Sequence, residues 1–480
     1  MYISQKRIGK KKSEILRRTK MPINAITSDH VIINGANKPA TIVYLTESGT
    51  ILDVLEGSVV MEKTEITKYE IHTLENVSPC TILPGLVDSH VHLNEPGRTS
   101  WEGFETGTQA AISGGVTTVV DMPLNAIPPT TNVENFRIKL EAAEGQMWCD
   151  VGFWGGLVPH NLPDLIPLVK AGVRGFKGFL LDSGVEEFPP IGKEYIEEAL
   201  KVLAEEDTMM MFHAELPKAY GDQQQPEQSH REYSSFLSSR PDSFEIDAIN
   251  LILECLRARN GPVPPVHIVH LASMKAIPLI RKARASGLPV TTETCFHYLC
   301  IAAEQIPDGA TYFKCCPPIR SESNRQGLWD ALREGVIGSV VSDHSPCTPE
   351  LKNLQKGDFF DSWGGIASVG LGLPLMFTQG CSLVDIVTWC CKNTSHQVGL
   401  SHQKGTIAPG YDADLVVFDT ASEHKISNSS VYFKNKLTAY NGMTVKGTVL
   451  KTILRGQVVY TNANGVSKTP LGQTLLDSRR

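Results

Sequence analysis

The chain has 480 residues, of which 41% are hydrophobic and 20% charged, so it has room for two or three domains and a large core. This composition excludes a disordered chain, a collagen-like repeat and a small disulfide scaffold. Apolar runs all fall short of the roughly 18 residues that a bilayer span needs, so we expect no membrane partner.

The formal net charge of -7 hides a basic segment at the amino terminus. Residues 1–20 carry eight lysines and arginines against one glutamate, a net charge of +7, which leaves -14 for the remaining residues. We expect residues 1–22 to be a solvated leader outside the fold, with ordinary composition beginning near Met21. A nucleic-acid arm, a nuclear signal and a transit-like segment are the alternatives, but the acidic remainder opposes a nucleic-acid partner.

Eleven cysteines, an odd number without a CxxC pair, predict reduced thiols rather than a disulfide framework or a zinc ribbon. The adjacent pairs Cys315-Cys316 and Cys390-Cys391 are not expected to form bridges, because neighbouring side chains diverge. Free thiols are typical of a reducing compartment, so we predict a cytoplasmic protein.

Short apolar, β-branched segments alternate with helix-like stretches through the middle of the chain, which indicates βα units around a parallel sheet. The eight segments lie at residues 81–93, 115–123, 150–158, 172–180, 208–216, 265–273, 288–299 and 335–346. Eight such units predict a (β/α)8 barrel over residues 80–396. A doubly wound open sheet is the rival fold, but neither a GxGxxG nor a Walker sequence follows the first strand.

The two flanks are different in character, because residues 29–60 and 411–462 contain short strand-like runs separated by Gly, Asn and Asp turns. Neither flank is long enough for a core of its own. We therefore predict one composite β domain, formed by residues 23–79 together with residues 397–480.

Ionisable residues fall at the ends of five of the predicted strands. His90 and His92 alternate along the first strand and so face the same side, Lys177 lies in the apolar fourth strand, and three further residues end later strands: His213, His270 and Asp343. Active sites of barrel enzymes assemble at the carboxyl ends of the strands. The six side chains therefore predict one metal site.

Charge balance suggests a role for the lysine. Four neutral imidazoles and one aspartate do not balance two divalent cations, and an ammonium group beside the cations would be repelled. If Lys177 reacts with carbon dioxide to form a carbamate, it becomes an anion with two oxygens that suits a bridge between two metals. A metal pair lowers the pKa of bound water and polarises a carbonyl, which favours hydrolysis.

The strings DSHVH, GFKGF, FHAE, VHLAS and SDHSP, in this order, resemble the cyclic amidohydrolases of the amidohydrolase superfamily, from about Asp29 to Tyr460. The resemblance implies a distorted (β/α)8 TIM barrel with a small β-sandwich domain from both termini, two Zn²⁺ ions or other divalent metals, and carbon dioxide bound as N6-carboxylysine. Carried over by motif, His90, His92 and Asp343 would hold one zinc, His213 and His270 the other, and carbamylated Lys177 would bridge them.

Within this family, two positions bear on the substrate. Asn94 stands where dihydroorotases have an arginine for the substrate carboxylate, and Asp182 stands where dihydropyrimidinases have a tyrosine. Longer strings, among them HLNEPGRTSWEGF and FKCCPPIR, resemble the allantoinase branch, of the fungal type. The implied reaction opens the hydantoin ring of allantoin to give allantoate, in purine degradation. Two other activities are the alternatives: that of a dihydropyrimidinase or hydantoinase, and that of a dihydroorotase. A scaffold protein without catalytic activity is a further alternative.

The resemblance also implies roles for further residues. A bridging hydroxide would attack the ring carbonyl, and Asp343 would carry its proton to the leaving nitrogen. Backbone groups near Cys316 and Gly365 would hold the ring imide, with Asn94 and Ser345 lining the pocket. Asp88 and His344 are candidates for orienting the metal ligands. We expect a small-molecule substrate and a homo-oligomer.

Overall fold

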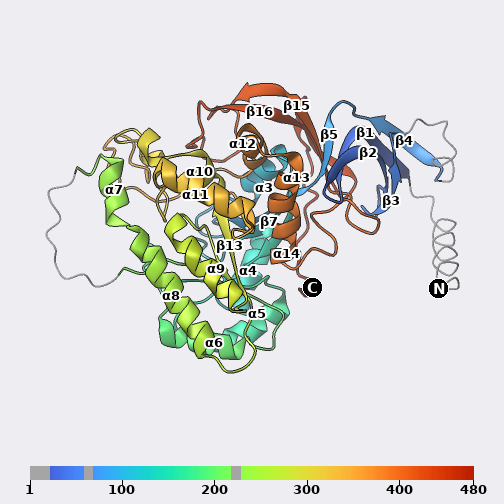
Figure 1. Ribbon diagram of the computed structural model, residues 1–480. Coiled ribbons are helices and arrows are strands. Elements are labelled where there is room, and N and C mark those ends of the chain that lie inside the picture. Colours follow the sequence, from blue (N-terminus) through green and yellow to red (C-terminus); the bar gives the residue numbers. More distant parts are fainter. Residues whose placement is uncertain (1–21, 59–68, 218–228, 480) are drawn as a thin grey trace.

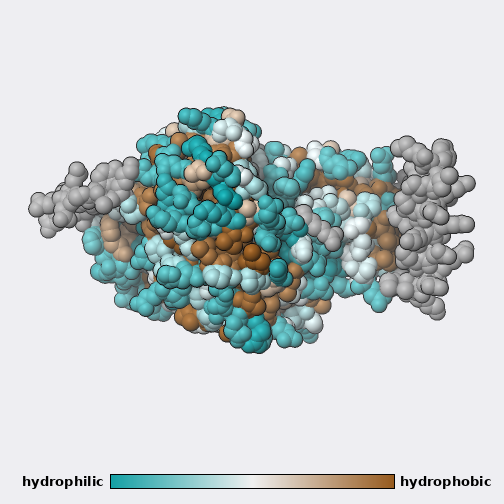
Figure 2. Space-filling model, turned by 90° about the horizontal axis from the view of Figure 1, so that it is seen from below, coloured by the Kyte–Doolittle hydropathy of each residue, from teal (hydrophilic) through white to brown (hydrophobic). Residues whose placement is uncertain are grey.

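The computed structural model describes residues 22–58, 69–217 and 229–479 (Figure 1). The predicted basic leader therefore lies, apart from Pro22, outside the described residues. In the described part of the chain, no helix is long and apolar enough to cross a membrane. On the face drawn in Figure 2, hydrophilic residues cover most of the surface and hydrophobic residues gather near the middle.

Parallel strands form the barrel, and every barrel strand up to β12 is buried along its whole length. The strands are β6 (Leu86–Val91), β7 (Val116–Asp121), β8 (Asp150–Phe153), β9 (Gly155–Gly156), β10 (Phe176–Phe179), β11 (Met210–His213), β12 (Val266–Ile268), β13 (Val290–Cys295) and β14 (Ser339–Val341). Only Trp154 separates β8 from β9, and a parallel bridge between Val91 and His344 joins the last strand region to the first. The predicted (β/α)8 barrel is confirmed.

Helices surround these strands and cover the outside of the barrel (Figure 1). They are α3 (Phe104–Ser113), α4 (Val133–Ala143), α5 (Leu165–Ala171), α6 (Lys193–Val202), α7 (Tyr233–Ser239), α8 (Asp242–Ala258), α9 (Ile277–Ala285), α10 (Phe296–Cys300), α11 (Glu322–Arg333), α12 (Gly372–Thr378), α13 (Leu383–Val387) and α14 (Asn393–Gln397). In α8, apolar residues such as Ile249, Ile252 and Leu256 are buried at a helical spacing. The side chain of Ser321 caps α11 by accepting a hydrogen bond from the Asn324 N–H.

Both ends of the chain join one nine-stranded sheet, in which β4 pairs with β1 beside the main path β18-β17-β16-β15-β5-β1-β2-β3. Its strands are β1 (Ile23–Ile33), β2 (Ala36–Leu45), β3 (Ile51–Glu56), β4 (Ile71–Asn76), β5 (Thr81–Pro84), β15 (Leu415–Lys425), β16 (Thr444–Leu454), β17 (Gln457–Thr461) and β18 (Gly465–Val466). Strand β5 pairs with β1 on one side and with β15 on the other, so it joins the two halves.

The composite β domain thus has the strand content that the flanks predict, and Figure 1 places β1–β4 at one end of the molecule. Strand β5 pairs within this sheet although it falls inside the predicted barrel range, and it leads within two residues into β6. We keep the division into residues 23–79 with 397–480 and residues 80–396 as a proposal. All eleven cysteines are free thiols, as the sequence predicts.

Candidate metal centre

Five of the six predicted ligands lie near or just beyond the carboxyl ends of barrel strands, and Lys177 lies within a strand. His90 is in β6 and His92 just beyond it, Lys177 is in β10, His213 ends β11, and two ligands follow β12 and β14 by two residues: His270 and Asp343. All six are buried, none more than 7% exposed. Because parallel strands end on the same side of a barrel, side chains far apart in the sequence meet at one place.

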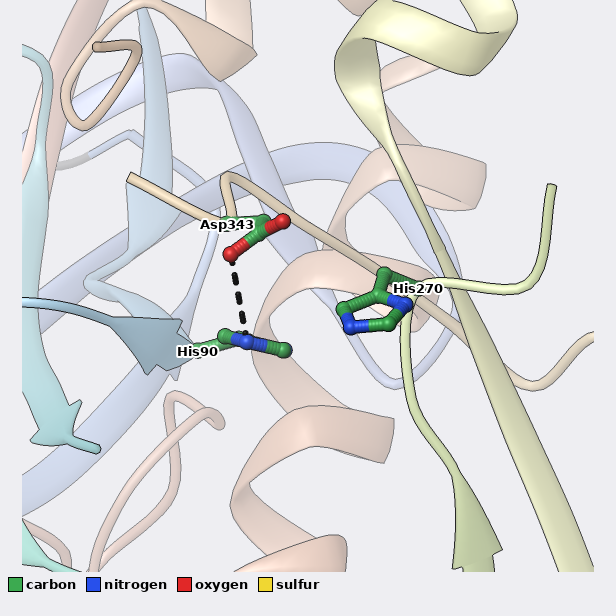
Figure 3. A group of neighbouring side chains, drawn as sticks. All are labelled: His90, His270 and Asp343. Carbon is green, nitrogen blue, oxygen red and sulfur yellow. Dashed lines mark ion pairs between the residues drawn. The ribbon is translucent and has the colours of Figure 1, made fainter. Parts of the chain in front are cut away.

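Distances between these side chains are those of a compact cluster. His90 Nε2 lies 3.1 Å from Lys177 Nζ and 3.2 Å from Asp343 Oδ1, and His92 Nε2 lies 3.5 Å from the same oxygen. One ligand atom from each of His90, His270 and Asp343 falls within 4.8 Å of the others, and Figure 3 shows His90 pointing toward Asp343. The centroids of the His270 and His213 rings are 4.6 Å apart. The cluster thus has the size of a shared cation site.

Two ligands of this cluster have strained backbones. His270 and Asp343 adopt φ angles of 38° and 44°, in the left-handed region that costs a non-glycine residue about 1–2 kcal/mol. Each lies just beyond a strand, where the chain turns out of the barrel. The turn aims the two side chains back over the barrel mouth, so strain is concentrated where ligand direction matters.

Buried carboxylates orient the histidines, and the sequence reasoning missed them. Glu293 Oε1 lies 2.6 Å from His90 Nδ1, which leaves Nε2 facing the cluster. Glu215 Oε2 lies 2.7 Å from His213 Nε2, which leaves Nδ1 free to act as a ligand, and Arg240 holds both oxygens of Glu215. Metal-binding histidines usually make such a contact through the second ring nitrogen. An acidic residue inside a β-branched strand segment, as in TTETC, is the signal that identifies Glu293.

The sequence predicted Asp88 and His344 as residues that orient the metal ligands, but neither side chain contacts a ligand side chain in the hydrogen bonds described below. Asp88 accepts hydrogen bonds from the N–H groups of His90, at 3.4 Å, and Ser342, at 3.2 Å, and burial raises its pKa to about 7. His344 instead lies 3.3 Å from Glu102 through Nε2 and accepts a hydrogen bond from the Ser368 N–H at Nδ1. His344 thus braces the loop after β14 rather than a ligand.

The pKa shifts of three of the histidines and of Asp343 favour the protonation states that bind metal, which are the neutral imidazole and the ionised carboxylate. Burial lowers the pKa of His92 to about 3 and lowers the pKa values of His213 and His270, so these rings are neutral at pH 7. Burial works against ionisation of Asp343, but His90, His92 and His270 hold its pKa well below the usual value. The site therefore presents three neutral imidazoles, from His92, His213 and His270, and the Asp343 carboxylate.

Lys177 differs from a surface lysine, because burial lowers its pKa to about 8. An amine with that pKa is about 10% neutral at pH 7, against well under 1% for an exposed lysine. Its ammonium group also lies over the Phe179 ring, 5.2 Å from the centroid. The neutral amine is the form that reacts with carbon dioxide.

The donor set fits divalent cations. His270 Nδ1 is buried and has no hydrogen-bond partner among the described residues, a costly arrangement without a ligand. Nitrogen donors from four imidazoles with carboxylate oxygen are typical of zinc and neighbouring transition metals.

A cavity of about 340 Å³ opens beside the cluster and is lined by His92, Lys177, His213, His270 and Asp343. Three of the predicted substrate contacts also line it: Cys316, Ser345 and Gly365. Asn94 does not; it is buried, and its Nδ2 donates to the Pro346 carbonyl at 3.3 Å. Sequence reasoning missed several lining residues: Asn125, Arg240, Lys314 and Trp363.

Comparison with known proteins agrees with this geometry. Residues 81–459 match the amidohydrolase family, so the chain belongs to that family. Among solved structures, an L-hydantoinase (dihydropyrimidinase) from Arthrobacter aurescens superimposes with a TM-score of 0.84 at 25% identity, covering 94% of this chain and 99% of the other.

Closer relatives within the family carry a more specific name. The chain is 99% identical over 460 residues to the allantoinase of Saccharomyces cerevisiae, covering 96% of this chain and 100% of that protein. It is 45% identical over 406 residues to the allantoinase of Streptomyces avermitilis, covering 84% and 89%. The predicted resemblance to fungal allantoinases is confirmed.

Proposed function

We propose that the protein is an enzyme that hydrolyses the hydantoin-ring amide of allantoin to allantoate. One observation carries the proposal: the chain is 99% identical, over the whole length of that relative, to a fungal allantoinase. The buried cluster at the barrel mouth and the adjoining cavity provide a site in which a cyclic amide can be bound and hydrolysed.

For the cluster itself we propose two divalent cations, zinc in the first instance. His90, His92 and Asp343 would hold one and His213 and His270 the other, with Lys177 as the bridging N6-carboxylysine. When bound, such a pair lowers the pKa of water toward neutrality and polarises a carbonyl. The lowered pKa of Lys177 supports carbamate formation.

The chain's own residues handle the proton. A water molecule attacks the ring carbonyl, and the Asp343 carboxylate accepts the proton of that water and passes it to the ring nitrogen as the amide bond breaks. Neighbouring histidines keep Asp343 ionised and ready to accept it. Glu293 and Glu215 hold the rings of His90 and His213 in place through the reaction.

Substrate contacts follow from the cavity walls. We propose that backbone groups near Cys316 and Gly365 and the Ser345 side chain contact the ring, since all three residues line the cavity. Asn94 acts at a distance by holding the Pro346 carbonyl. The absence of an arginine at this position is compatible with a ring that carries no carboxylate.

The test is a parallel assay of metal-loaded protein with allantoin, hydantoin, dihydrouracil and dihydroorotate. We expect turnover with allantoin at least tenfold faster than with the others. Preferred turnover of hydantoin or dihydrouracil would instead support the hydantoinase activity that the Arthrobacter structure suggests. A protein that takes up no metal on loading and turns over none of the four substrates would indicate a scaffold.

We also propose a homo-oligomer located in the cytoplasm. The eleven free thiols support a reducing compartment. Light scattering on the purified protein measures the assembly, and microscopy of a tagged chain tests the location.

A further inference from the structure

His344 and Ile366 form an isolated parallel bridge, and residues 346–365 lie between them in the chain. These residues contain no regular helix or strand and form one wall of the cavity. The last part of this segment, from Phe360 to Gly365, faces the cavity. Such irregular segments are normally fixed by their hydrogen bonds, since they lack a ladder of their own. The bonds that fix this wall therefore decide what the cavity presents to a ligand.

Lys352 makes those bonds from behind the wall. Its side chain is buried and does not line the cavity beside the metal cluster. Its Nζ donates to the carbonyl oxygens of Trp363, at 3.0 Å, Gly365, and Lys314, at 3.4 Å. Among the described residues no carboxylate forms an ion pair with it. An ammonium group buried without a counterion is costly, so a purely packing role would favour an apolar side chain.

The peptide between Trp363 and Gly364 is the part of the wall that Lys352 orients. This peptide is trans, so its N–H points away from the carbonyl that Lys352 holds. The Gly364 N–H donates no hydrogen bond to any residue in the described part of the chain. Gly364 lines the cavity, and a side chain there would come within 3.3 Å of Cys316 Sγ. An unpaired N–H at a cavity wall is a donor that a ligand carbonyl can satisfy.

We propose that Lys352 is a positioning residue for substrate binding: its buried ammonium group holds and polarises the Trp363–Gly364 peptide so that the Gly364 N–H donates to a ring carbonyl of the substrate. The inference rests on the proposed function, because the ligand is a cyclic amide. The carbonyl concerned is the one that is not attacked, since the attacked one faces the metal cluster. The three N–H donors of one ammonium group match the three carbonyls.

A second buried lysine holds two other carbonyls of the same wall. Lys314 Nζ donates to the carbonyls of Phe360, at 3.2 Å, and Ser362, at 2.5 Å. Lys314 lines the cavity, so it also belongs to the binding site itself. Lys352 is the better subject for an experiment because its side chain does not line the cavity and contacts the wall only through backbone carbonyls.

The experiment compares the holoenzyme with Lys352→Met, which keeps the length of the side chain and removes its charge and donors. We expect KM for allantoin to rise about five- to tenfold, the range of one lost hydrogen bond, while kcat changes less than threefold. Metal content and melting temperature are measured on the same samples. Lys356→Met, on the same wall but exposed and paired with Asp358 at 3.0 Å, is the matched control and should leave KM unchanged.

A substrate analogue separates positioning from loosened structure. In the analogue the unattacked ring carbonyl is a thiocarbonyl, a poorer acceptor. Wild type should bind allantoin several-fold more tightly than the analogue, and Lys352→Met should lose most of that preference. An unchanged KM, or an equal loss for both ligands, would overturn the proposal. If Lys352→Met does not fold, Lys352→Gln, which keeps a hydrogen-bond donor without the charge, is tested instead. The ratio of its affinities for allantoin and for the analogue is compared with that of wild type. A wild type that does not turn over allantoin refutes the proposed function instead.

Discussion

Single residues in this protein acquire their chemistry from burial. Lys177 is 1% exposed, lies 3.1 Å from a histidine nitrogen and has its pKa lowered to about 8, whereas an exposed lysine stays charged at neutral pH. The same removal from water keeps His92 neutral. The tenth or so of Lys177 that is neutral at pH 7 is the form that can be converted to a carbamate, and a neutral imidazole beside it does not repel a cation.

The pH dependence of carbamate formation follows from this lowered pKa. In protein freed of metal and carbon dioxide, we expect the rate of reactivation by zinc and a fixed concentration of dissolved carbon dioxide to rise about tenfold per pH unit below 8. Above pH 8 it should level off, since Lys177 is then mostly neutral. Recovery of activity with time at several pH values measures it, and a rate that continues to rise to pH 10 would contradict the assignment.

Removal of the lysine should empty the site. We expect Lys177→Ala to bind neither metal and to lose activity by a factor of at least 10³, with partial recovery when a small carboxylic acid takes the place of the carbamate. Metal analysis and the allantoin assay are the measurements. The exposed Lys201 on α6 gives the control, Lys201→Ala, which should keep both metals. Full activity of Lys177→Ala would rule out a bridging role.

At the scale of the element, strand β13 links the metal cluster to the rest of the barrel. Its residue Glu293 contacts His90 Nδ1 at 2.6 Å and His267 Nε2 at 3.1 Å, and it accepts a hydrogen bond from Gln397. Burial opposes ionisation, but His267 and His90 hold the pKa of Glu293 well below its usual value. One inward-facing carboxylate thus fixes groups from β6, β12 and α14 relative to one another.

Replacement of this carboxylate should weaken metal binding without breaking the fold. In Glu293→Gln an amide replaces one charged oxygen beside His90, so the ring loses its fixed orientation and basicity. We expect metal affinity to fall about 10- to 100-fold. Competition with a chelator measures the affinity, and Glu205→Gln, at an exposed position, is the control. Equal affinities of the two variants would show that Glu293 has no part in holding His90.

At the scale of the whole molecule, a buried ion cluster joins the barrel to the terminal sheet. Lys404 Nζ lies 2.6 Å from Asp150 at the start of β8 and 2.8 Å from both Asp412 and Asp414, next to β15. Arg455, between β16 and β17, also pairs with Asp150. The side chain of Lys404 is fully buried, so its charge depends on these partners.

Loss of Lys404 should destabilise both parts together. Lys404→Met leaves three carboxylates close to one another without their shared cation, and we expect the free energy of unfolding to fall by about 3–5 kcal/mol. Denaturant unfolding followed by fluorescence measures the change. The exposed Lys446 on β16 provides the control Lys446→Met, expected within about 0.5 kcal/mol of wild type. A loss for Lys404→Met as small as the control's would show that the cluster adds no net stability.

Much of this organisation was predictable from local patterns. The eight strand segments are visible because parallel strands covered by helices are apolar along their length, and the ligands stand out because His90, Lys177 and Asp343 interrupt such segments. The terminal sheet was predictable as strands. The exact boundary between the sheet and the barrel was not predictable, since β5 pairs within the sheet although it lies inside the predicted barrel range and leads within two residues into β6.

By itself, the sequence determined the barrel and the six candidate ligands, because alternation and motif spacing are local properties of the chain. The branch of the family came from the resemblance of its longer motif strings. Only the tertiary structure decided which carboxylates orient the histidines, that Asn94 lies outside the cavity wall, and that Lys352 lies behind it. These facts depend on contacts between segments tens to hundreds of residues apart. The burial of a side chain and the direction in which it points determine these contacts, and neither can be read from the spacing of residues along the chain.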